Sequence, residues 1–318
     1  EKRKIMERKH EKYERLIARC KAMAPIPTAV AHPCDESSLR GAVEAAEMGI
    51  LQPILVGPRD KIKAVAAEFH LDISKYEIVD AEHSNDSAAK AVQLAREGKA
   101  EMLMKGSLHT DELMGAVVRS ATGLRTERRI SHAFIMDVPS LDRTIIVTDA
   151  AINIFPTLED KKHIVQNAID LLTALGFPQP KVAILSAMET VNPDVPSTVE
   201  AAALCKMADR KQITGGILDG PLALDNAIDI NAARIKKIDS PVAGMADILV
   251  APDLEAGNML AKSLSFMADA DAAGIVLGAR VPIILTSRAD SVMTRLASCA
   301  VAALVAQSRR ENAGKAVT

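Results

Sequence analysis

Short apolar runs alternate with amphipathic stretches along almost the whole chain, and no other feature restricts the possible fold as much. Each run has the length of one strand, and the runs lie at residues 28–33, 53–58, 100–106, 144–151, 181–187, 215–220, 247–252, 274–278 and 281–287. Their apolar residues are continuous rather than alternating, which is typical of strands buried on both faces. The repeated strand–helix order therefore predicts an α/β fold with mostly parallel sheets and helices on both faces.

The stretches between these runs carry recognisable helix ends. Ser87 precedes one helical segment and Gly98 follows it, as expected of an N-terminal cap and a C-terminal glycine. Residues 157–160 (Thr-Leu-Glu-Asp) and 197–200 (Ser-Thr-Val-Glu) have the spacing of capping boxes. We therefore predict helices that begin at these three places, the second of which ends at Gly176.

The composition excludes one class of function. The chain has 318 residues, of which 48% are hydrophobic but only 2% are aromatic, and its net charge is -2. Aromatic side chains are too few for stacking on single-stranded nucleic acid, and a nearly neutral chain does not attract polyanions over long range. We therefore expect an aliphatic core and no nucleic-acid partner.

The cysteines and the hydropathy pattern bear on where the protein acts. Cys20, Cys34, Cys205 and Cys299 are too far apart for a CxxC metal or redox motif, which favours reduced thiols in the cytoplasm. We find no signal-peptide pattern, and the longest apolar stretch is too short to span a bilayer. We therefore expect a cytoplasmic protein with no membrane partner.

Residues 1–25 differ from the rest because they are densely charged. Their apolar side chains can share one face of a helix and are Ile5, Tyr13, Leu16, Ile17, Cys20 and Met23. Acidic residues are interleaved with the basic ones, which argues against an arm that binds nucleic acid. We predict a charged helix with one apolar face, and a linker cut from a longer chain is the alternative.

In α/β sheets of this kind, ligands bind beyond the carboxyl ends of the strands, so the polar residues there are candidates for the site. At the last strand end, Ser287 and Arg288 present a hydroxyl and a guanidinium. Arginine binds phosphate oxygens through two parallel hydrogen bonds, and serine can donate to an oxyanion in acyl transfer. The alternative is that Ser287 caps the next helix and Arg288 lies on the surface. A serine hydrolase is disfavoured because no GxSxG motif occurs.

An earlier strand end offers a second candidate anion site. Lys105 and Gly106 follow a strand directly, and Thr110 stands near the start of a helix. A lysine, a hydroxyl and the amides of a helix start suit a phosphate, although the segment is not a Walker A loop. The alternative is an ordinary strand–helix turn. The carboxylates of Asp111 and Glu112 support this alternative, because they would repel an anion.

Two further polar stretches have both a functional and a structural interpretation. In the basic stretch, Arg125 and Arg128 are interpreted as solvated, Ser131 as facing a cleft, and His132 as a structural hydrogen-bonding residue. The aspartates at positions 219, 225 and 229 could bind Mg²⁺ only if they converged. We favour a Gly-Pro turn followed by a helix with a solvated acidic face.

Several long segments together resemble one family. They are "LMKGSLHTDEL", "VTDAAINIFPTLEDKKHIVQNAID", "ILDGPLALDNAI", "SPVAGMADILVAPDLEAGNML" and "ILTSRADS", in this order from about residue 26 to the C-terminus. The chain resembles the phosphate acetyltransferase/phosphate butyryltransferase family and looks closer to its butyryl branch. The resemblance implies that acyl-CoA and phosphate react reversibly to give acyl phosphate and CoA.

The resemblance also implies an architecture. It is a two-domain fold like that of isocitrate and isopropylmalate dehydrogenases, with the active site in the cleft between the domains. The first domain would comprise residues 26–150 and 279–318, and the second residues 151–278. The family implies a homodimer, no metal and no permanently bound cofactor, with acyl-CoA and inorganic phosphate as substrates. The charged N-terminal segment is similar to the junction in family members that carry an enoyl-CoA hydratase-like domain ahead of this one.

Roles for individual residues follow from the same resemblance. Ser287 would hydrogen-bond the oxyanion, Arg288 would hold the phosphate oxygens, and Asp290 is a candidate base for the CoA thiol. The phosphate or acyl phosphate would be bound by Lys105, Gly106, Thr110, Ser131, Asp149 and Asn153. CoA would be bound by Asn258, Lys262 and Gly278.

Two positions depart from the acetyl branch of the family. The aspartate regarded there as the base, seven residues after the matched serine, is Thr294 here, and an arginine expected near Phe266 is absent. A thiol with an ordinary pKa of about 8.5 needs help to lose its proton in the reverse reaction, whereas phosphate is already an anion. Both departures agree with an apolar acyl pocket larger than an acetyl group requires.

Three other functions stay open on the sequence. An NAD-dependent oxidative decarboxylase on the same fold would need a Lys–Tyr pair, but the chain has only Tyr13 and Tyr76. A non-catalytic acyl-CoA sensing domain would bind CoA without turnover. Transfer from acyl carrier protein would need a basic docking face, which the sequence does not show.

Overall fold

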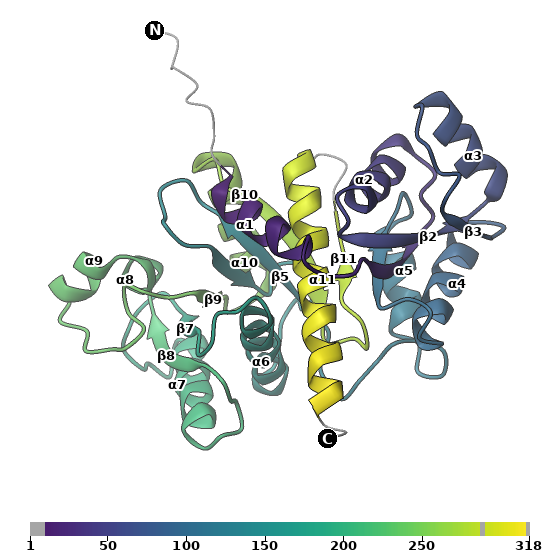
Figure 1. Ribbon diagram of the computed structural model, residues 1–318. Helices are drawn as coiled ribbons and strands as arrows, with labels where there is room; N and C mark the ends of the chain where they lie inside the picture. Colours follow the sequence, from purple (N-terminus) through teal and green to yellow (C-terminus); the bar gives the residue numbers. More distant parts are fainter. Residues whose placement is uncertain (1–9, 287–289, 316–318) are drawn as a thin grey trace, which may run out of the picture.

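The computed structural model describes residues 10–286 and 290–315, and one sheet runs through this whole part of the molecule (Figure 1). The 11 strands of this sheet lie in the order β3-β2-β1-β4-β11-β10-β5-β6-β9-β7-β8. Their bounds are β1 (Ile26–Ala31), β2 (Leu51–Gly57), β3 (Glu77–Asp80), β4 (Met102–Lys105), β5 (Ser131–Asp137), β6 (Ile145–Thr148), β7 (Lys181–Leu185), β8 (Ile217–Leu222), β9 (Ile248–Val250), β10 (Asp271–Leu277) and β11 (Ile283–Ile284).

Two blocks of parallel strands point in opposite directions. β1 to β4 and β11 form the first block, and β6 to β9 form the second. The antiparallel pairs β11–β10, β10–β5 and β5–β6 join the two blocks. The prediction of an α/β fold with a mostly parallel sheet is therefore confirmed.

Helices cover both faces of the sheet, as the continuous apolar runs predicted. They are α1 (Glu11–Cys20), α2 (Glu36–Glu47), α3 (Arg59–Glu68), α4 (Ser84–Arg96), α5 (Thr110–Val117), α6 (Leu158–Ala174), α7 (Pro196–Asp209), α8 (Leu224–Ile228), α9 (Ile230–Ile235), α10 (Leu254–Met267) and α11 (Val292–Lys315). On one face, α1, α2, α6 and α11 enclose a core that crosses both blocks (Figure 1). On the other face, α4 and α5 cover the first block, and α8 to α10 cover the second.

The N-terminal helix α1 has the apolar face that the sequence predicted. Its buried residues are Tyr13, Leu16, Ile17 and Cys20. The hydroxyl of Tyr13 donates to the carbonyl of Ile135 at 2.5 Å and accepts from the amide of Ala273 at 3.0 Å. One side chain therefore ties α1 to β5 and β10, the two strands that join the blocks.

Local capping signals predicted one helix start and missed another. Thr157 and Asp160 form the predicted capping box of α6, and Gly176 follows this helix with a φ of 89°. The predicted start after Ser87 is wrong, because α4 begins four residues earlier, at Ser84, where the imidazole of His83 accepts a backbone amide and caps the helix. Histidine is an uncommon cap, so the sequence pattern did not show it.

The second capping box and one predicted loop are also wrong. The helix α7 begins at a proline and has no side-chain cap, and the hydroxyl of Ser197 pairs instead with that of Ser186 at 2.8 Å. Proline at the first helical position presets the backbone, which makes a cap less necessary. Residues 219–221, predicted as a loop, lie inside β8. A proline fits there because β8 is the last strand of the sheet.

Candidate active site

A cavity of about 970 Å³ lies between α5 and the start of α6. The segment 125–130 forms one wall, and residues 151 and 152, which follow β6, form another. Since α5 belongs to the first block of strands and α6 to the second, the cavity lies between the two blocks. We call it the interblock cavity. Among the predicted site residues, Thr110 at the start of α5 lines it directly.

The turn after β6 is organised by one buried carboxylate. Asp149 is 3% exposed, and its Oδ1 accepts the amides of Ala151 at 2.9 Å and Ile152 at 3.0 Å. Its Oδ2 accepts the side-chain amide of Asn153 at 2.6 Å and the backbone amide of His132 at 3.2 Å. Aspartate favours such turns because its side chain can accept amides two and three residues ahead. In this structure Asp149 shapes the cavity wall rather than presenting a free oxygen to it.

A second hydrogen-bond network holds the segment before β5. Asn153 Oδ1 accepts from Arg129 Nε at 2.8 Å, and Asn167 on α6 donates to Ser131 Oγ at 2.9 Å. Ser131 is 1% exposed, so its hydroxyl faces α6 and not the cavity. Gly278 packs on the same segment, where a Cβ would lie 2.4 Å from the carbonyl of Arg129. Ser131, Asn153 and Gly278 therefore lie close together, and they support the wall of the interblock cavity.

Three arginines of the basic stretch line the interblock cavity, which the sequence analysis did not foresee for Arg125 and Arg128. Arg128 pairs with Asp170 at 3.2 Å, and Arg129 is held by Asn153. Within the described part of the chain, no hydrogen bond or ion pair holds the exposed side chain of Arg125. Four carboxylates also line the cavity, at positions 111, 127, 159 and 160. Arg125 is therefore the arginine of this wall that is available to an incoming anion.

The turn after β4 approaches the backbone of β1 very closely. The amide of Gly106 donates to the carbonyl of Ala31 at 2.8 Å, and a Cβ at Gly106 would lie 2.2 Å from that oxygen. Only glycine fits there. Lys105 Nζ donates to the carbonyl of Gly106 at 3.2 Å. Because Met104 pairs with Ile284, this turn lies beside the segment that follows β11.

The predicted residues Ser287 and Arg288 lie outside the described residues. Asp290 is described, and its carbonyl accepts from Arg295 Nη1 at 2.8 Å. Thr294, where the family resemblance implied an aspartate in the acetyl branch, is 4% exposed and accepts from the hydroxyl of Ser291 at 3.0 Å. A buried, hydrogen-bonded hydroxyl at this position does not replace a carboxylate base.

The two remaining predicted residues lie on α10 and do not line the interblock cavity. Asn258 donates from Nδ2 to the carbonyl of Ala150 at 3.1 Å and thereby anchors the Asp149 turn. Lys262 is exposed. Of the two residues on α10, Asn258 therefore supports the cavity wall and Lys262 lies on the exposed face of the helix.

His132 lies behind the Asp149 turn as an uncharged ring. Burial lowers the pKa of His132 to about 4, and the nearby Asp149 carboxylate opposes this shift only in part. The ring meets Phe134 edge-on, with centroids 4.4 Å apart. His132 is thus neutral at pH 7, but its buried Nδ1 has no hydrogen-bond partner among the described residues, so the structure does not confirm the predicted hydrogen-bonding role of the ring.

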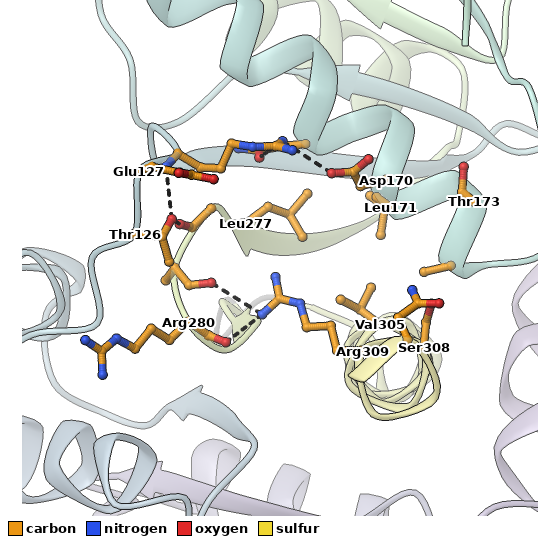
Figure 2. A pocket seen from close by; sticks show the side chains of 16 residues that line it. Thr126, Glu127, Asp170, Leu171, Thr173, Leu277, Arg280, Val305, Ser308 and Arg309 are labelled. Carbon is orange, nitrogen blue, oxygen red and sulfur yellow. Dashed lines mark hydrogen bonds and ion pairs between the residues drawn. The ribbon is translucent and has the colours of Figure 1, made fainter. Parts of the chain in front are cut away.

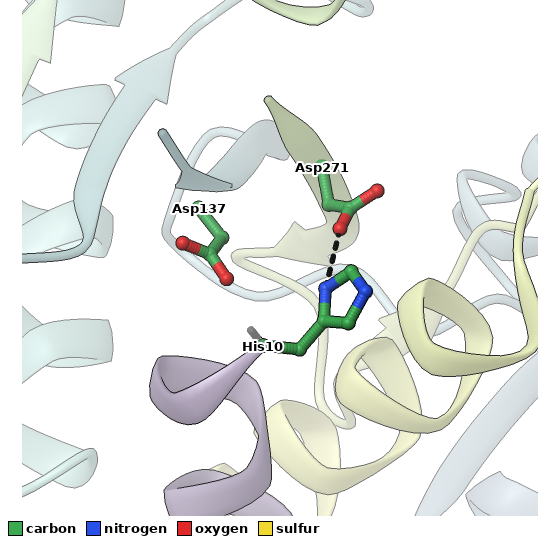
Figure 3. A group of neighbouring side chains, drawn as sticks. All are labelled: His10, Asp137 and Asp271. Carbon is green, nitrogen blue, oxygen red and sulfur yellow. Dashed lines mark ion pairs between the residues drawn. The ribbon is translucent and has the colours of Figure 1, made fainter. Parts of the chain in front are cut away.

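Carboxylates and a histidine converge at a different place from the aspartates that the sequence analysis weighed. Within the described residues, the group with metal-like spacing is His10, Asp137 and Asp271 (Figure 3). His10 Nδ1 lies 2.9 Å from Asp271 Oδ2, and Lys12 Nζ lies 2.8 Å from Asp137 Oδ1. The ammonium of Lys12 already supplies a cation to this group. We interpret the cluster as ion pairs that fasten α1 to the ends of β5 and β10.

Comparison with known proteins agrees with this architecture. Residues 82–303 match the family described as phosphate acetyl/butaryl transferase. The chain belongs to this acyltransferase family. Phosphate acetyltransferase from Rhizobium meliloti is 70% identical over 299 residues, which cover 94% of this chain and 95% of that protein. Phosphate butyryltransferase from Clostridium acetobutylicum is 40% identical over 297 residues, which cover 93% and 99%.

A solved structure gives the same result for the fold. The branched-chain phosphotransacylase from Enterococcus faecalis V583 superposes with a TM-score of 0.77 at 32% identity, covering 88% of this chain and 99% of that one. The family resemblance inferred from the motifs is therefore confirmed. The closeness to the butyryl branch is not supported by these names, because the acetyltransferase is the more similar of the two curated relatives.

Proposed function

We propose that the protein transfers an acyl group reversibly between CoA and inorganic phosphate, so that acyl-CoA and phosphate give acyl phosphate and CoA. The observation that carries this proposal is the family match over residues 82–303, which contains every residue that lines the interblock cavity. The relatives named for acetyl and butyryl transfer both match more than nine-tenths of the chain. Acetyl-CoA and butyryl-CoA are therefore the substrates to test.

The chemistry needs positioning more than proton removal in the forward direction. A phosphate oxygen attacks the thioester carbonyl, the C–O bond forms, and the resulting oxyanion expels the CoA thiolate as the C–S bond breaks. The thiolate then takes a proton. Holding two reactants in line replaces a bimolecular encounter and can lower the barrier by roughly 7–11 kcal/mol. Arginine and hydroxyl donors suit the phosphate and the oxyanion.

We assign the following roles as proposals. Ser287 donates to the oxyanion, Arg288 binds phosphate oxygens in a bidentate manner, and Asp290 accepts the thiol proton in the reverse reaction. Arg125 and Thr110 bind phosphate from the wall of the interblock cavity, and Lys105 and Gly106 extend the anion site toward β11. Ser131, Asp149 and Asn153 position that wall. For CoA we propose Asn258, Lys262 and Gly278.

The finer architecture is also a proposal. We propose a two-domain fold like that of isocitrate and isopropylmalate dehydrogenases, with residues 26–150 and 279–318 as one domain and 151–278 as the other. The reversal of strand direction between the two blocks supports a division into two domains, although β6 of the second block falls within residues 26–150. The position of the interblock cavity supports an active site between the domains.

We also propose a homodimer that acts in the cytoplasm. The dimer is supported by exposed apolar side chains on α10, where Met259 is 61%, Phe266 is 86% and Met267 is 84% exposed. Monomers rarely leave such groups together in water. Among the described helices, none has both the length and the apolar composition that a bilayer crossing requires.

One assay tests the proposed function. Thiol release from acetyl-CoA and from butyryl-CoA is followed with a thiol reagent, with and without phosphate. We expect release that depends on phosphate, and the two rates rank the acyl groups. CoA binding without phosphate-dependent release would contradict the transferase and favour the sensing domain.

A further inference from the structure

A cavity of about 440 Å³ lies between the N-terminal helix α1, the end of α6 and the amino ends of three strands of the second block. Residues 142–144 precede β6, residues 178 and 180 precede β7, and Asp247 precedes β9, and these three strands are parallel. The interblock cavity lies toward the opposite edge of the sheet, because residues 151 and 152 follow β6. We call the new cavity the α1 cavity. The proposed acyl transfer does not use it.

The helix α6 forms a fixed wall of the α1 cavity, because it is held from its other side (Figure 2). There, Arg128 pairs with Asp170 at 3.2 Å, and Leu171 faces a separate cavity. Leu172 and Leu175 line the α1 cavity instead. Ligand sites are usually largely preformed and measure roughly 300–1,000 Å³, and the α1 cavity fits both criteria.

Two arginines reach the cavity from one face of α1. Arg15 and Arg19 are four residues apart, so they stand one helical turn from each other. Arg15 Nε donates to the carbonyl of Glu11 at 3.2 Å, and Arg19 donates to the carbonyl of Leu175. Both side chains are exposed, and in the part of the chain that the structure describes neither is paired with a carboxylate. Each guanidinium therefore keeps donors for an anion.

A third arginine lines the cavity from the wall at the strand ends. Arg143 lies 3.8 Å from the carboxylate of Asp142, whose side chain is 95% exposed, so water weakens this pair. Arg143 Nε donates to the carbonyl of Ala246 at 3.3 Å, and its Nη2 is buried with no hydrogen-bond partner among the described residues. A buried donor without an acceptor is costly. The chain by itself thus leaves this guanidinium short of acceptors.

Apolar side chains form the rest of the lining. Leu16 on α1 and the two leucines of α6 are buried, and Phe177 beyond the end of α6 is 54% exposed. Pro178 and Pro180 extend this surface. Ligand sites typically combine such apolar walls with a few polar groups that fix the orientation of the ligand. A ligand that fits this cavity therefore has an anionic head and an apolar tail.

The other charged groups of the lining favour a head with a single negative charge. Lys12 is already paired with Asp137 at 2.8 Å. Asp142 and Asp247 also line the cavity, and Asp247 Oδ2 accepts the amide of Lys181 at 2.8 Å. Coulomb repulsion by these two carboxylates is twice as large for a phosphate dianion as for a carboxylate at the same distance.

We propose that the α1 cavity is a binding site for a small carboxylic acid with an apolar tail. The carboxylate is bound by the guanidinium groups of Arg15, Arg19 and Arg143, whose planar forks match carboxylate oxygens. The tail packs on the leucines and Phe177. The ligand bridges α1 and the second block of strands, at a place distinct from the interblock cavity.

Calorimetric titration of the full chain with octanoate tests this site. The wild type should bind octanoate, and Arg15→Ala and Arg143→Gln should each weaken binding about tenfold or more, as for loss of a charge-assisted hydrogen bond. The matched control is Arg234→Ala, because Arg234 is also an exposed arginine on a helix but lies outside the cavity, and it should bind as the wild type does. Wild-type affinity in both Arg15→Ala and Arg143→Gln would overturn the proposal.

Three further probes test the head and the tail separately. Acetate lacks the tail, octan-1-ol lacks the charge, and inorganic phosphate is an anion without a tail, so each should bind at least about tenfold more weakly than octanoate. Octan-1-ol binding as tightly as octanoate would reveal only an apolar surface, and phosphate binding as tightly would reveal only a general anion site. Either result would overturn the proposal.

A last variant distinguishes the α1 cavity from the proposed active site. Arg125→Ala alters the interblock cavity and should leave octanoate binding unchanged. Weaker octanoate binding in Arg125→Ala, together with wild-type binding in Arg15→Ala, would place the acid in the interblock cavity and refute the new site. None of these measurements depends on acyl transfer, so the site and the proposed function can fail independently.

Discussion

The substitution Asp149→Asn changes a single atom of the side chain and tests whether one carboxylate organises the wall of the interblock cavity. Asp149 accepts the amides of Ala151 and Ile152 on Oδ1. On Oδ2 it accepts the amide of His132 and both the backbone and side-chain amides of Asn153. Every donor that faces this carboxylate therefore needs an acceptor, and an amide NH₂ group can only donate.

The magnitude follows from this arrangement. In the variant, the NH₂ group must occupy the place of either Oδ1 or Oδ2. The place of Oδ1 costs less, because only two backbone amides then lose their acceptor. Leaving one buried donor without an acceptor costs roughly 1–3 kcal/mol, so the free energy of unfolding should fall by about 2–6 kcal/mol. That is a large share of the roughly 5–15 kcal/mol typical of a folded domain.

Urea unfolding of the wild type and of Asp149→Asn measures this difference. The matched control is Asp142→Asn, because the side chain of Asp142 is 95% exposed and its loss should change the free energy of unfolding by less than about 0.5 kcal/mol. Phosphate-dependent thiol release should fall together with stability, since the turn carries residues 151 and 152 of the cavity wall. The reasoning is refuted if Asp149→Asn is as stable as Asp142→Asn.

Three further outcomes are expected. Arg125→Ala should raise KM for phosphate about tenfold in the thiol assay, as for loss of one charge-assisted bond. Arg119→Ala is the control, because Arg119 is exposed and lies outside the interblock cavity, and it should leave this KM unchanged. Equal KM values for the two variants would remove Arg125 from the site. Gly106→Ala should lower the free energy of unfolding by about 1–3 kcal/mol or more, because the added Cβ would lie 2.2 Å from a backbone carbonyl oxygen. Gly115→Ala on α5 is the control. A Cβ at Gly115 meets no atom within 4 Å, so this variant should be neutral or stabilising. His132→Asn should flatten the acid side of the stability profile. The folded pKa of His132 is about 4 and its unfolded pKa is near 6.5, so stability present above pH 6.5 is lost toward pH 4, by up to about 3 kcal/mol in the wild type. Equal acid slopes for the wild type and His132→Asn would contradict this.

Local patterns predicted elements well wherever the determining contacts are close in sequence. The capping box at Thr157 involves residues three apart, and the strand runs need only continuous apolar side chains. Prediction failed where a residue had two possible roles. Ser87 and Ser197 have the chemistry of helix caps, but His83 and a proline start those helices instead.

The candidate site shows the same contrast between properties that local sequence predicts and properties that depend on distant contacts. The family resemblance implied that Ser131 and Asp149 bind substrate, and the structure places both in internal hydrogen bonds. Arg125 was interpreted as solvated, yet it lines the cavity between the blocks. Residue type alone does not distinguish a polar group that holds a wall from one that meets a ligand, because the difference depends on partners distant in the chain.

The sequence by itself determined the class of fold, the family and the aliphatic core, because strand–helix alternation, long motifs and composition are properties of neighbouring residues. Only the tertiary structure decided that two blocks of opposite direction share one sheet, and that residues 125–130 and the start of α6 bound a cavity between the blocks. It also decided which arginines are committed to carboxylates and which are free. The physical reason is that burial and charge pairing depend on groups brought together by β5, β10 and α11, whose partners lie far away along the chain.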